Sequence, residues 1–195
     1  MSAVLSTMRA LGSPAADFTL PNLNQPMLGK ADASVSLNEL SAKPLLVMFI
    51  CNHCPYVIHI AERMTELAND AVNKGFAVVA ISSNDVLNYP QDGPEAMTDF
   101  AHQYGFNFPY LYDESQQIAK AYAAACTPDF FVFDADHALQ YRGQMDAARP
   151  GNSVEVSGDQ LAAAINSVYL GDAVNPHQVA SIGCNIKWKA GNQPT

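Results

Sequence analysis

The chain has few charged side chains, and positive ones are the scarcest. Only 10 of its 195 residues are Lys or Arg, against 19 Asp or Glu, which gives a net charge of −9. An acidic chain without a basic cluster is a poor partner for nucleic acid or for an anionic membrane surface. Its apolar runs are also short, since none approaches the roughly 20 residues of a transmembrane helix. We therefore expect no nucleic acid and no membrane as a partner.

Cysteine is scarce as well, with four in the whole chain. So few cysteines in a protein of this length do not make a disulfide framework. Residues 1–13 contain one Arg and no continuous apolar segment, so we expect no signal peptide. Without an export signal the expected location is the reducing cytoplasm, where a cysteine pair more often serves catalysis than structure.

The overall composition is that of a folded globular protein. Apolar residues make up 49% of the chain and charged residues 15%, which is ordinary for such proteins and argues against disorder. A chain of this length is most simply one domain, 1–195, with its core at about 12–170. The tail, 171–195, carries Ile182, Cys184 and Trp188, so we expect it to pack on the domain and keep those side chains from water.

One stretch concentrates the chemistry, Cys51-Asn52-His53-Cys54-Pro55. It lies between an apolar run that predicts a buried strand and a run with helical periodicity. Pro55 fits the first helical position, because it has no N–H and a fixed φ, so Cys54 is the predicted N-cap. The partial positive charge and free N–H groups of a helix start favour thiolate over thiol. A Cys-x-x-Cys near a βαβ pattern indicates a thioredoxin-like redox motif.

Other interpretations of these residues stay open. Free cysteines are among the most buried residue types, so Cys51 and Cys54 could be inert core residues. A single Cys-x-x-Cys is weak evidence for a structural zinc site, which requires four ligands. We therefore expect no metal and no cofactor. His53 could favour the thiolate by charge or hydrogen bonding, or be a partly exposed turn residue.

Buried runs that alternate with helical segments predict an α/β fold with a parallel core sheet. Expected strands or short extended segments lie at 16–20, 35–37, 45–50, 76–82, 109–112, 129–134 and 138–143, the last two as an antiparallel hairpin. One expected helix starts at Pro55 and ends near 73 with Gly75 as its C-cap, and another starts at Glu95 with Gly105 as its C-cap. Two more are expected after an N-cap, the first at Ser115 and the second at Ser157 or Asp159. From Gly171 the chain is expected to be irregular.

The polar loop 83–94 is long for an α/β connection. Loops at the carboxyl ends of strands face the ligand crevice of such folds, which favours a functional role. A variable surface loop explains the pattern equally well.

Several motifs carry a resemblance to a known family. The element order, with the cysteines after the first core strand, is similar to that of thioredoxins. Residues 12–20 resemble the start of the peroxiredoxin-like branch, the alkyl hydroperoxide reductase/thiol-specific antioxidant group. Thr127-Pro128 before a strand resembles the cis-proline loop that faces the active cysteines of thioredoxin-fold enzymes. Further runs that resemble a peroxiredoxin-like thioredoxin family lie at 49–57, 83–85, 141–144 and 183–188.

This resemblance covers about residues 12–190 and implies a thioredoxin-like three-layer fold. Its central mixed sheet would be flanked by helices, with an N-terminal extension and a C-terminal tail. Pro128 is expected to be cis, which only about 5–6% of X–Pro bonds are. Counting from Phe49 as in thioredoxins places Cys54 at the nucleophile position, with Cys51 as its partner. The usual thioredoxin order would instead make Cys51 the attacking thiol, and it stays the alternative.

The peroxidatic pattern of peroxiredoxins is incomplete in this sequence. That family carries Pro and then Thr or Ser at seven and three residues before its peroxidatic cysteine. Cys54 has Val47 and Cys51 at these offsets, whereas Cys51 has Pro44 and Met48. Neither cysteine therefore has the hydroxyl that helps to bind peroxide.

The resulting functional hypothesis is an enzyme, a thiol–disulfide oxidoreductase with a role in cell redox balance or antioxidant defence. Cys54 would attack a disulfide and Cys51 would resolve the mixed disulfide. The expected partners are a disulfide-containing protein or a small disulfide, and a thiol reductant, with the protein a monomer or homodimer. Thr127 and Pro128 would present backbone to the extended chain of a substrate.

Two alternative functions remain. One is a thiol peroxidase that uses Cys54, with Cys51, Cys126 or Cys184 as the resolving thiol. The other is a redox-responsive binding protein without turnover. Cys126 and Cys184 are expected to be secondary thiols, and packing is the simplest role for each.

Overall fold

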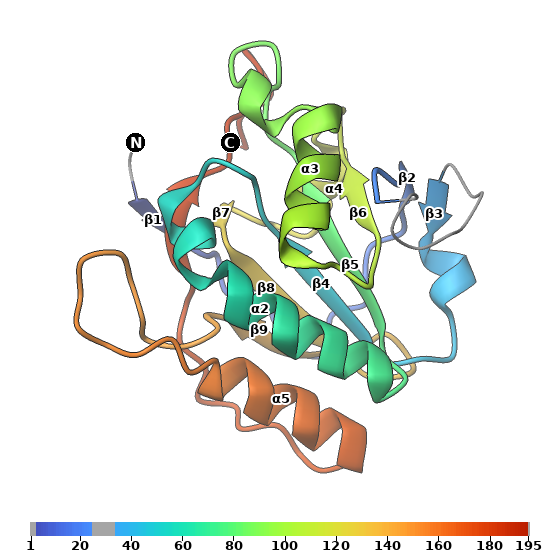
Figure 1. Ribbon diagram of the computed structural model, residues 1–195. Coiled ribbons are helices and arrows are strands. Elements are labelled where there is room, and N and C mark those ends of the chain that lie inside the picture. The colour runs from blue at the N-terminus through green and yellow to red at the C-terminus, as the bar shows by residue number, and fades with distance from the viewer. Residues whose placement is uncertain (1–2, 25–33, 195) are drawn as a thin grey trace.

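A five-stranded mixed sheet forms the centre of the computed structural model, which describes residues 3–24 and 34–194 (Figure 1). Its strand order is β6-β5-β4-β8-β9. These strands are β4 (Leu45–Phe49), β5 (Ala77–Ser82), β6 (Tyr110–Tyr112), β8 (Asp129–Phe133) and β9 (Leu139–Gly143). β4, β5 and β6 run parallel, whereas β8 and β9 form the expected antiparallel hairpin beside β4. The predicted mixed α/β sheet is confirmed.

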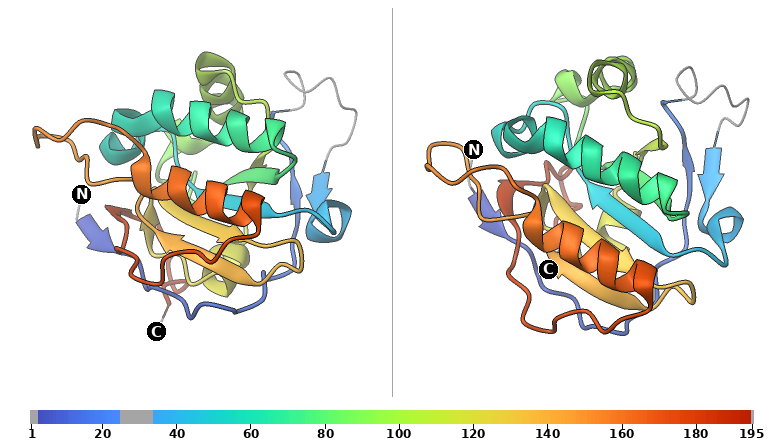
Figure 2. Two further views of the ribbon diagram at one scale, coloured as in Figure 1. Left: turned by 90° about the horizontal axis from the view of Figure 1, so that it is seen from below. Right: turned by 60° about the horizontal axis from the view of Figure 1, so that its bottom comes forward.

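Helices cover both faces of this sheet and make three layers (Figures 1 and 2). α2 (Pro55–Asn73), α3 (Pro94–Tyr104) and α5 (Asp159–Leu170) lie on one face, and α4 (Gln117–Ala121) lies on the other. Successive side chains of a strand point to opposite faces, so Leu46 and Met48 of β4 pack with the first group while Val47 and Phe49 pack against Tyr122, just after α4. Both faces of β4 are therefore buried, which explains its unbroken apolar sequence.

The remaining strands lie outside the central sheet. β2 (Thr19–Pro21) pairs with β3 (Ser34–Ser36), which leads into the 3-10 helix η1 (Leu37–Leu40). β1 (Ala3–Leu5), β10 (Ile182–Asn185) and β7 (Cys126–Thr127) form a second small sheet with β10 in the middle. The expectation of an irregular tail after Gly171 is thus wrong at β10. This strand of 4 residues is too short to show a period, and it is held by partners distant in sequence.

Helix boundaries follow the sequence closely at C-termini and less closely at N-termini. Gly105 is the C-cap of α3, as predicted, with a φ of 71°. The C-cap of α2 is Lys74, so the prediction of Gly75 is wrong by one residue, and Gly75 follows with a φ of 91°. The N-cap of α4 is Gln116 rather than Ser115, although the Ser115 hydroxyl accepts a hydrogen bond from the Gln117 N–H at 3.2 Å.

The N-cap of α5 is Gly158, so the prediction of Ser157 or Asp159 is wrong. The buried Asp146 carboxylate accepts a hydrogen bond from the Gly158 N–H at 2.7 Å. Gly158 also has a φ of 69°, and a Cβ there would lie 2.4 Å from Leu67 Cδ1. The contact with Asp146 therefore helps to set the start of α5, together with the Ser157 hydroxyl, which accepts the Asp159 N–H at 3.3 Å.

The Thr127–Pro128 peptide bond is cis, as predicted. It lies between β7 and β8, so the chain passes from the small sheet into the central sheet at this point. In the part of the chain that the structure describes, no helix has the length and apolar character needed to cross a membrane.

Gly183 lets β10 approach β7, and we expect its replacement to be costly. A Cβ on Gly183 would lie 2.0 Å from the carbonyl oxygen of Thr127, which is backbone and cannot rotate away. Gly183→Ala should therefore disrupt the β10–β7 pairing and lower the melting temperature by several degrees. In Gly191→Ala the new Cβ meets nothing within 4 Å and only the φ of 77° is unfavourable. Equal melting temperatures for the two variants would contradict this account of the strand contact.

Candidate active site

The cysteine stretch connects the end of β4 to the start of α2, as the sequence predicts. Cys54 is the N-cap of α2 and Pro55 is its first residue. The Val57 and Ile58 N–H groups donate to the Cys54 carbonyl oxygen, both at 3.0 Å, which fixes the first turn. The Cys54 sulfur is thereby held at the positive end of a helix of 19 residues, where a thiolate is favoured.

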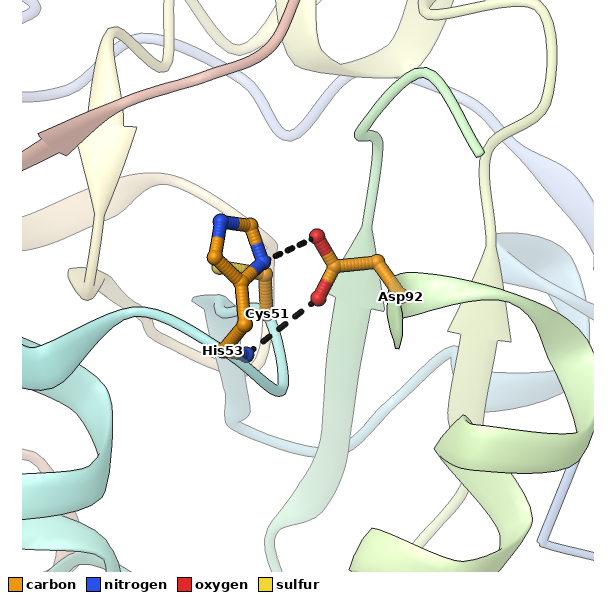
Figure 3. Close-up of side chains that lie close together, drawn as sticks. All are labelled: Cys51, His53 and Asp92. Carbon is orange, nitrogen blue, oxygen red and sulfur yellow. Dashed lines mark hydrogen bonds and ion pairs between the residues drawn. The ribbon is translucent and has the colours of Figure 1, made fainter. Parts of the chain in front are cut away.

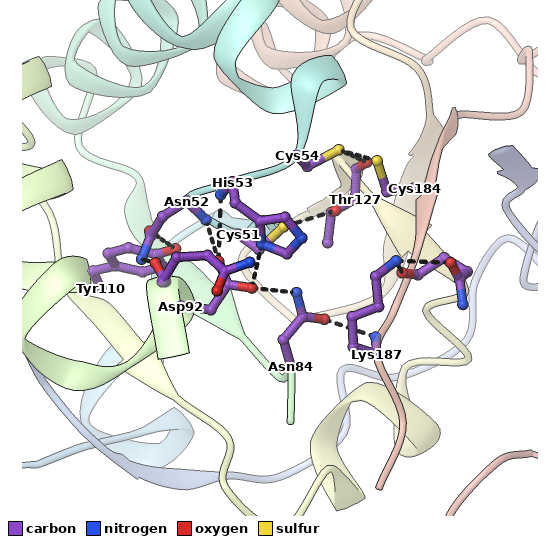
Figure 4. Close-up of polar contacts among 12 residues, drawn as sticks. Cys51, Asn52, His53, Cys54, Asn84, Asp92, Tyr110, Thr127, Cys184 and Lys187 are labelled. Atoms are coloured by element: carbon purple, nitrogen blue, oxygen red, sulfur yellow. Dashed lines mark hydrogen bonds and ion pairs between the residues drawn. The ribbon is translucent and has the colours of Figure 1, made fainter. Parts of the chain in front are cut away.

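Three backbone and side-chain groups surround the two sulfur atoms of this stretch (Figure 4). Cys54 Sγ lies 2.8 Å from Cys184 Sγ and 3.2 Å from the carbonyl oxygen of Thr127. Cys51 Sγ lies 3.3 Å from the Thr127 hydroxyl oxygen. Thr127 therefore contacts both cysteines, one through its side chain and the other through its backbone. Neither cysteine has a Thr or Ser three residues before it, as peroxiredoxins do. A hydroxyl reaches Cys51 from the distant Thr127 instead.

The pKa values of the two cysteines shift in opposite directions. A hydrogen bond from the Cys51 thiol lowers the pKa of Cys54 from 9.0 to about 5, with further help from Cys184 and from the Val57 N–H and against the effect of burial. The same hydrogen bond, together with burial and the negative charge of Asp92, raises the pKa of Cys51 well above its usual value. Near neutral pH the charge is thus expected on Cys54, with Cys51 as the protonated donor.

Asp92 anchors the turn between the two cysteines (Figure 3). It lies on the 3-10 helix η2 (Pro90–Asp92) and its side chain is fully buried. One carboxylate oxygen accepts the Asn52 N–H at 2.8 Å and the His53 N–H at 3.3 Å. The other lies 2.6 Å from His53 Nδ1 and accepts the Asn84 amide at 2.8 Å. His53, which the sequence left open, thus faces a buried carboxylate rather than solvent.

Further side chains hold the turn at Asn52 and His53 in place (Figure 4). The Tyr110 hydroxyl donates to Asn52 Oδ1 at 2.9 Å, and burial raises the pKa of Tyr110 well above its usual value. The His53 ring stacks on Tyr89, with centroids 5.7 Å apart. Asn84 accepts the Lys187 N–H at 2.8 Å and so joins the segment after β10 to the loop. The loop at 83–94 is therefore part of the site rather than a separate surface feature.

Sequence reasoning missed Asp92, Asn84 and Lys187 as site residues. The first two lie in the loop at the carboxyl end of β5, and that position was the available signal. Lys187 belongs to the run 183–188 that carries part of the family resemblance. Nothing local in the sequence indicates that these groups meet at the cysteine turn.

Cys51, His53 and Asp92 are also the residues that could hold a metal ion among those the structure describes. Each offers one ligand atom, and the three atoms lie within 4.8 Å of one another. A closed structural zinc site needs a fourth ligand. His53 Nδ1 and Asp92 already lie 2.6 Å apart, and the Cys51 sulfur contacts the Thr127 hydroxyl. Asp92 also accepts the backbone N–H groups of the turn.

Cys126 and Cys184, the two expected secondary thiols, differ in their surroundings. Cys126 is buried, its sulfur lies 3.8 Å from the carbonyl oxygen of Pro128, and burial strongly raises its pKa. Cys184 contacts Cys54 directly. Cys126 has the environment of a packing residue, whereas Cys184 belongs to the site.

The backbone of the cis-proline loop is already paired. Cys184 of β10 lies opposite Thr127, and Asn185 lies opposite Cys126. The expectation that Thr127 and Pro128 present free backbone to a substrate is therefore wrong for Thr127 in this conformation. The chain's own C-terminal strand occupies that edge, because Gly183 allows the close approach.

Asp129 follows the cis-proline and is an unusual buried carboxyl group. It is fully buried, and neither oxygen makes a hydrogen bond of normal geometry to a described residue. Burial raises its pKa to about 8, and weaker contacts with Ser181 and the Phe130 N–H oppose this only in part. In the folded state the group therefore holds its proton at pH values where an unfolded chain, with a pKa near 3.9, has lost it.

We expect this carboxyl group to make stability depend on pH. Between about pH 4 and pH 8 the folded state binds one more proton at Asp129 than the unfolded state, so the free energy of unfolding should fall by roughly 1.4 kcal/mol per pH unit as the pH rises. Asp129→Asn should remove this slope, because an amide does not titrate. Urea unfolding of both proteins at pH 5 and pH 8 measures it. Identical pH dependence in the two proteins would show that Asp129 ionises normally.

The fold and these contacts define a protein class, a thioredoxin-like fold with a cysteine pair at the start of a helix. A family model matches residues 11–142 and is described as the AhpC/TSA family, so the chain belongs to that family. The chain is thus an AhpC/TSA-family protein with a thioredoxin-like fold, as the sequence motifs predict. No curated protein matches the chain.

Solved structures share the fold of this chain. An uncharacterised conserved protein of Geobacillus kaustophilus is 47% identical, with a TM-score of 0.90 over 97% of each chain. A hypothetical protein of Sinorhizobium meliloti 1021 is also 47% identical, with a TM-score of 0.89 over 96% of this chain and 99% of the other. A secreted Mycobacterium tuberculosis disulfide oxidoreductase shares the fold, at 22% identity and a TM-score of 0.57 over 77% of this chain and 95% of its own.

Proposed function

We propose that the protein is a thiol–disulfide oxidoreductase in which Cys54 is the attacking thiol. The observation that carries this proposal is the Cys54 sulfur at the start of α2, 2.8 Å from the Cys184 sulfur, where contacts with Cys51 and Cys184 lower its pKa. A thiolate near neutral pH is the nucleophile of disulfide exchange. The family match and the thioredoxin-like fold support the same redox role.

The first step breaks the substrate disulfide. The Cys54 thiolate attacks R–S–S–R′, forms the Cys54–S–S–R mixed disulfide and releases R′S⁻. The Cys51 thiol then loses its proton to solvent and attacks the Cys54 sulfur, which gives a Cys51–Cys54 disulfide and releases RS⁻. A thiol reductant in the cytoplasm would return the pair to two thiols.

Burial limits access to this site. Cys54 is fully buried and Cys51 is 1% exposed, so a substrate sulfur reaches either atom only after a local opening. A small disulfide needs a smaller opening than a protein segment, because β10 already occupies the β7 edge. We therefore expect a small disulfide to react faster than a disulfide held in a folded protein.

The test is catalysis of small-disulfide reduction. Reduction of bis(2-hydroxyethyl) disulfide by dithiothreitol should be accelerated by the wild-type protein and not by Cys54→Ser. Hydrogen peroxide consumption with the same reductant tests the alternative, a thiol peroxidase. The Thr127 hydroxyl supports that alternative, yet it lies at Cys51 rather than at the thiolate. Peroxide consumption without disulfide reduction would overturn the proposal. Absence of both reactions would also overturn it and would indicate a binding protein without turnover.

A further inference from the structure

β10 brings a third thiol into the site, and its position suggests a reaction. We propose that Cys184 is a second resolving residue, which forms a disulfide with Cys54. The oxidised site would then exchange between a Cys51–Cys54 and a Cys54–Cys184 disulfide. This inference rests on the proposed function, because it requires Cys54 to be the thiol that attacks the substrate.

The geometry that supports the exchange is built by long-range contacts. The sulfur atoms of Cys54 and Cys184 are 2.8 Å apart, on residues separated by 130 positions in the chain, and a disulfide bond closes at about 2.05 Å. The register of β10 against β7 places Cys184 opposite Thr127, whose carbonyl oxygen lies 3.2 Å from Cys54 Sγ. β1 pairs with the other edge of β10 and holds the strand in place.

The position of Cys184 is the one a substrate sulfur would need. In the expectation drawn from the sequence, an extended substrate chain lies along Thr127 and offers a sulfur to the attacking cysteine. In the structure β10 is that extended chain, and Cys184 is its sulfur-bearing residue beside Cys54. A Cys54–Cys184 disulfide would therefore join two sulfur atoms that the β10–β7 register already holds in contact.

The chemistry balances without another reagent. In the mixed disulfide Cys54–S–S–R, the Cys184 thiolate attacks the Cys54 sulfur, the Cys54–Cys184 bond forms, and RS⁻ leaves and takes up the proton that Cys184 gave to solvent. The Cys51 thiol can then lose its proton to solvent and attack the same Cys54 sulfur, which forms Cys51–Cys54 and releases the Cys184 thiolate to take up a proton in turn. This second exchange replaces the Cys54–Cys184 disulfide with the Cys51–Cys54 disulfide, so the site stays at the same oxidation state.

The pKa of Cys184 should fall when Cys54 forms the mixed disulfide, which favours attack by the Cys184 thiolate. Burial and its contact with the charged Cys54 raise the pKa of Cys184 to about 12, while Lys187 lowers it. Once Cys54 is in a mixed disulfide its negative charge is gone, so the pKa of Cys184 should fall. Cys184 is thus a proton donor before the attack on the substrate and becomes a nucleophile after it.

The experiment uses Cys51→Ser, in which Cys184 is the thiol in contact with Cys54. The reduced variant is treated with one equivalent of 5,5′-dithiobis(2-nitrobenzoate). We expect two equivalents of thionitrobenzoate per reagent molecule, one from the attack and one from displacement by Cys184. Tryptic mapping should then show Cys54 linked to Cys184, which lie on different tryptic peptides.

The matched control is Cys51→Ser/Cys184→Ser, which should release one equivalent and keep a stable adduct on Cys54. An adduct that is equally stable in Cys51→Ser, with no Cys54–Cys184 peptide, would overturn this inference and leave the proposed function intact. Absence of any adduct on Cys54 in both proteins would overturn both. If the double variant does not fold, peptide mapping of oxidised Cys51→Ser decides the question alone.

Discussion

Cys54→Ser is expected to lose both the fast thiol and all turnover, whereas Cys51→Ser is expected to keep the fast thiol. The reason is that the pKa of Cys54 lies at about 5 and that of Cys51 lies well above the usual value. The rate of alkylation of the reduced wild-type protein should therefore rise between about pH 4 and pH 6 and stay level to pH 8. In Cys54→Ser that inflection should disappear, since burial still raises the pKa of each remaining cysteine and keeps it slow to react.

Alkylation by iodoacetamide over this pH range, with the labelled peptide identified by mass spectrometry, measures the effect. Cys51→Ala provides a graded control, because it removes the donor group that Cys51→Ser replaces with a hydroxyl. The hydrogen bond from Cys51 is the largest cause of the low pKa, so the inflection should move upward in Cys51→Ala. Cys184→Ala removes a smaller contribution and should move it less. A fast, low-pKa thiol that survives in Cys54→Ser and vanishes in Cys51→Ser would restore the usual thioredoxin assignment of the two roles.

The same shift has a consequence for stability. The pKa of Cys54 is lower in the folded protein than the value of about 8.5 expected for an unfolded chain. Its thiolate therefore contributes stability that is fully present above about pH 8.5 and is lost as the pH falls toward 5. Oxidation of Cys54 to either disulfide should abolish this pH dependence.

Asp92→Ala is expected to destabilise the protein by about 3–5 kcal/mol, the usual cost of removing one partner from a buried charged network. The substitution leaves the Asn52 N–H, the His53 N–H and the Asn84 amide without their acceptor. For a chain of this size that corresponds to a melting temperature roughly 10 °C lower. Asp92→Asn keeps the shape and one acceptor oxygen, so its effect should be smaller.

Thermal and urea unfolding of these variants give the comparison. Asp99→Ala is the matched control, because Asp99 is exposed on α3 and its loss should change stability by no more than about 0.5 kcal/mol. Asp92 also raises the pKa of Cys51, so Asp92→Asn should lower that pKa and speed resolution of a mixed disulfide. An Asp92→Ala protein as stable as Asp99→Ala would mean that the turn does not depend on this carboxylate.

Local patterns in the sequence were enough to predict the framework of the site. The apolar run before Cys51 predicts β4, and Pro55 identifies Cys54 as the N-cap. The Thr127-Pro128 pair predicts the cis bond by family resemblance. The strand and the N-cap depend on residues next to one another in the chain, through an apolar run or a fixed φ, so a single sequence contains the information.

Only the tertiary structure decided which distant groups surround the cysteines. Asp92 and Cys184 reach the turn from 40 and 130 positions away, and no local propensity records such a distance. β10 was predicted as irregular, because four residues show no period and its stability comes from pairing with β1 and β7. The cysteine motif is thus determined by its own sequence, whereas the partners that set its charge and its second thiol are determined by how the loop after β5 and the C-terminal strand fold against it.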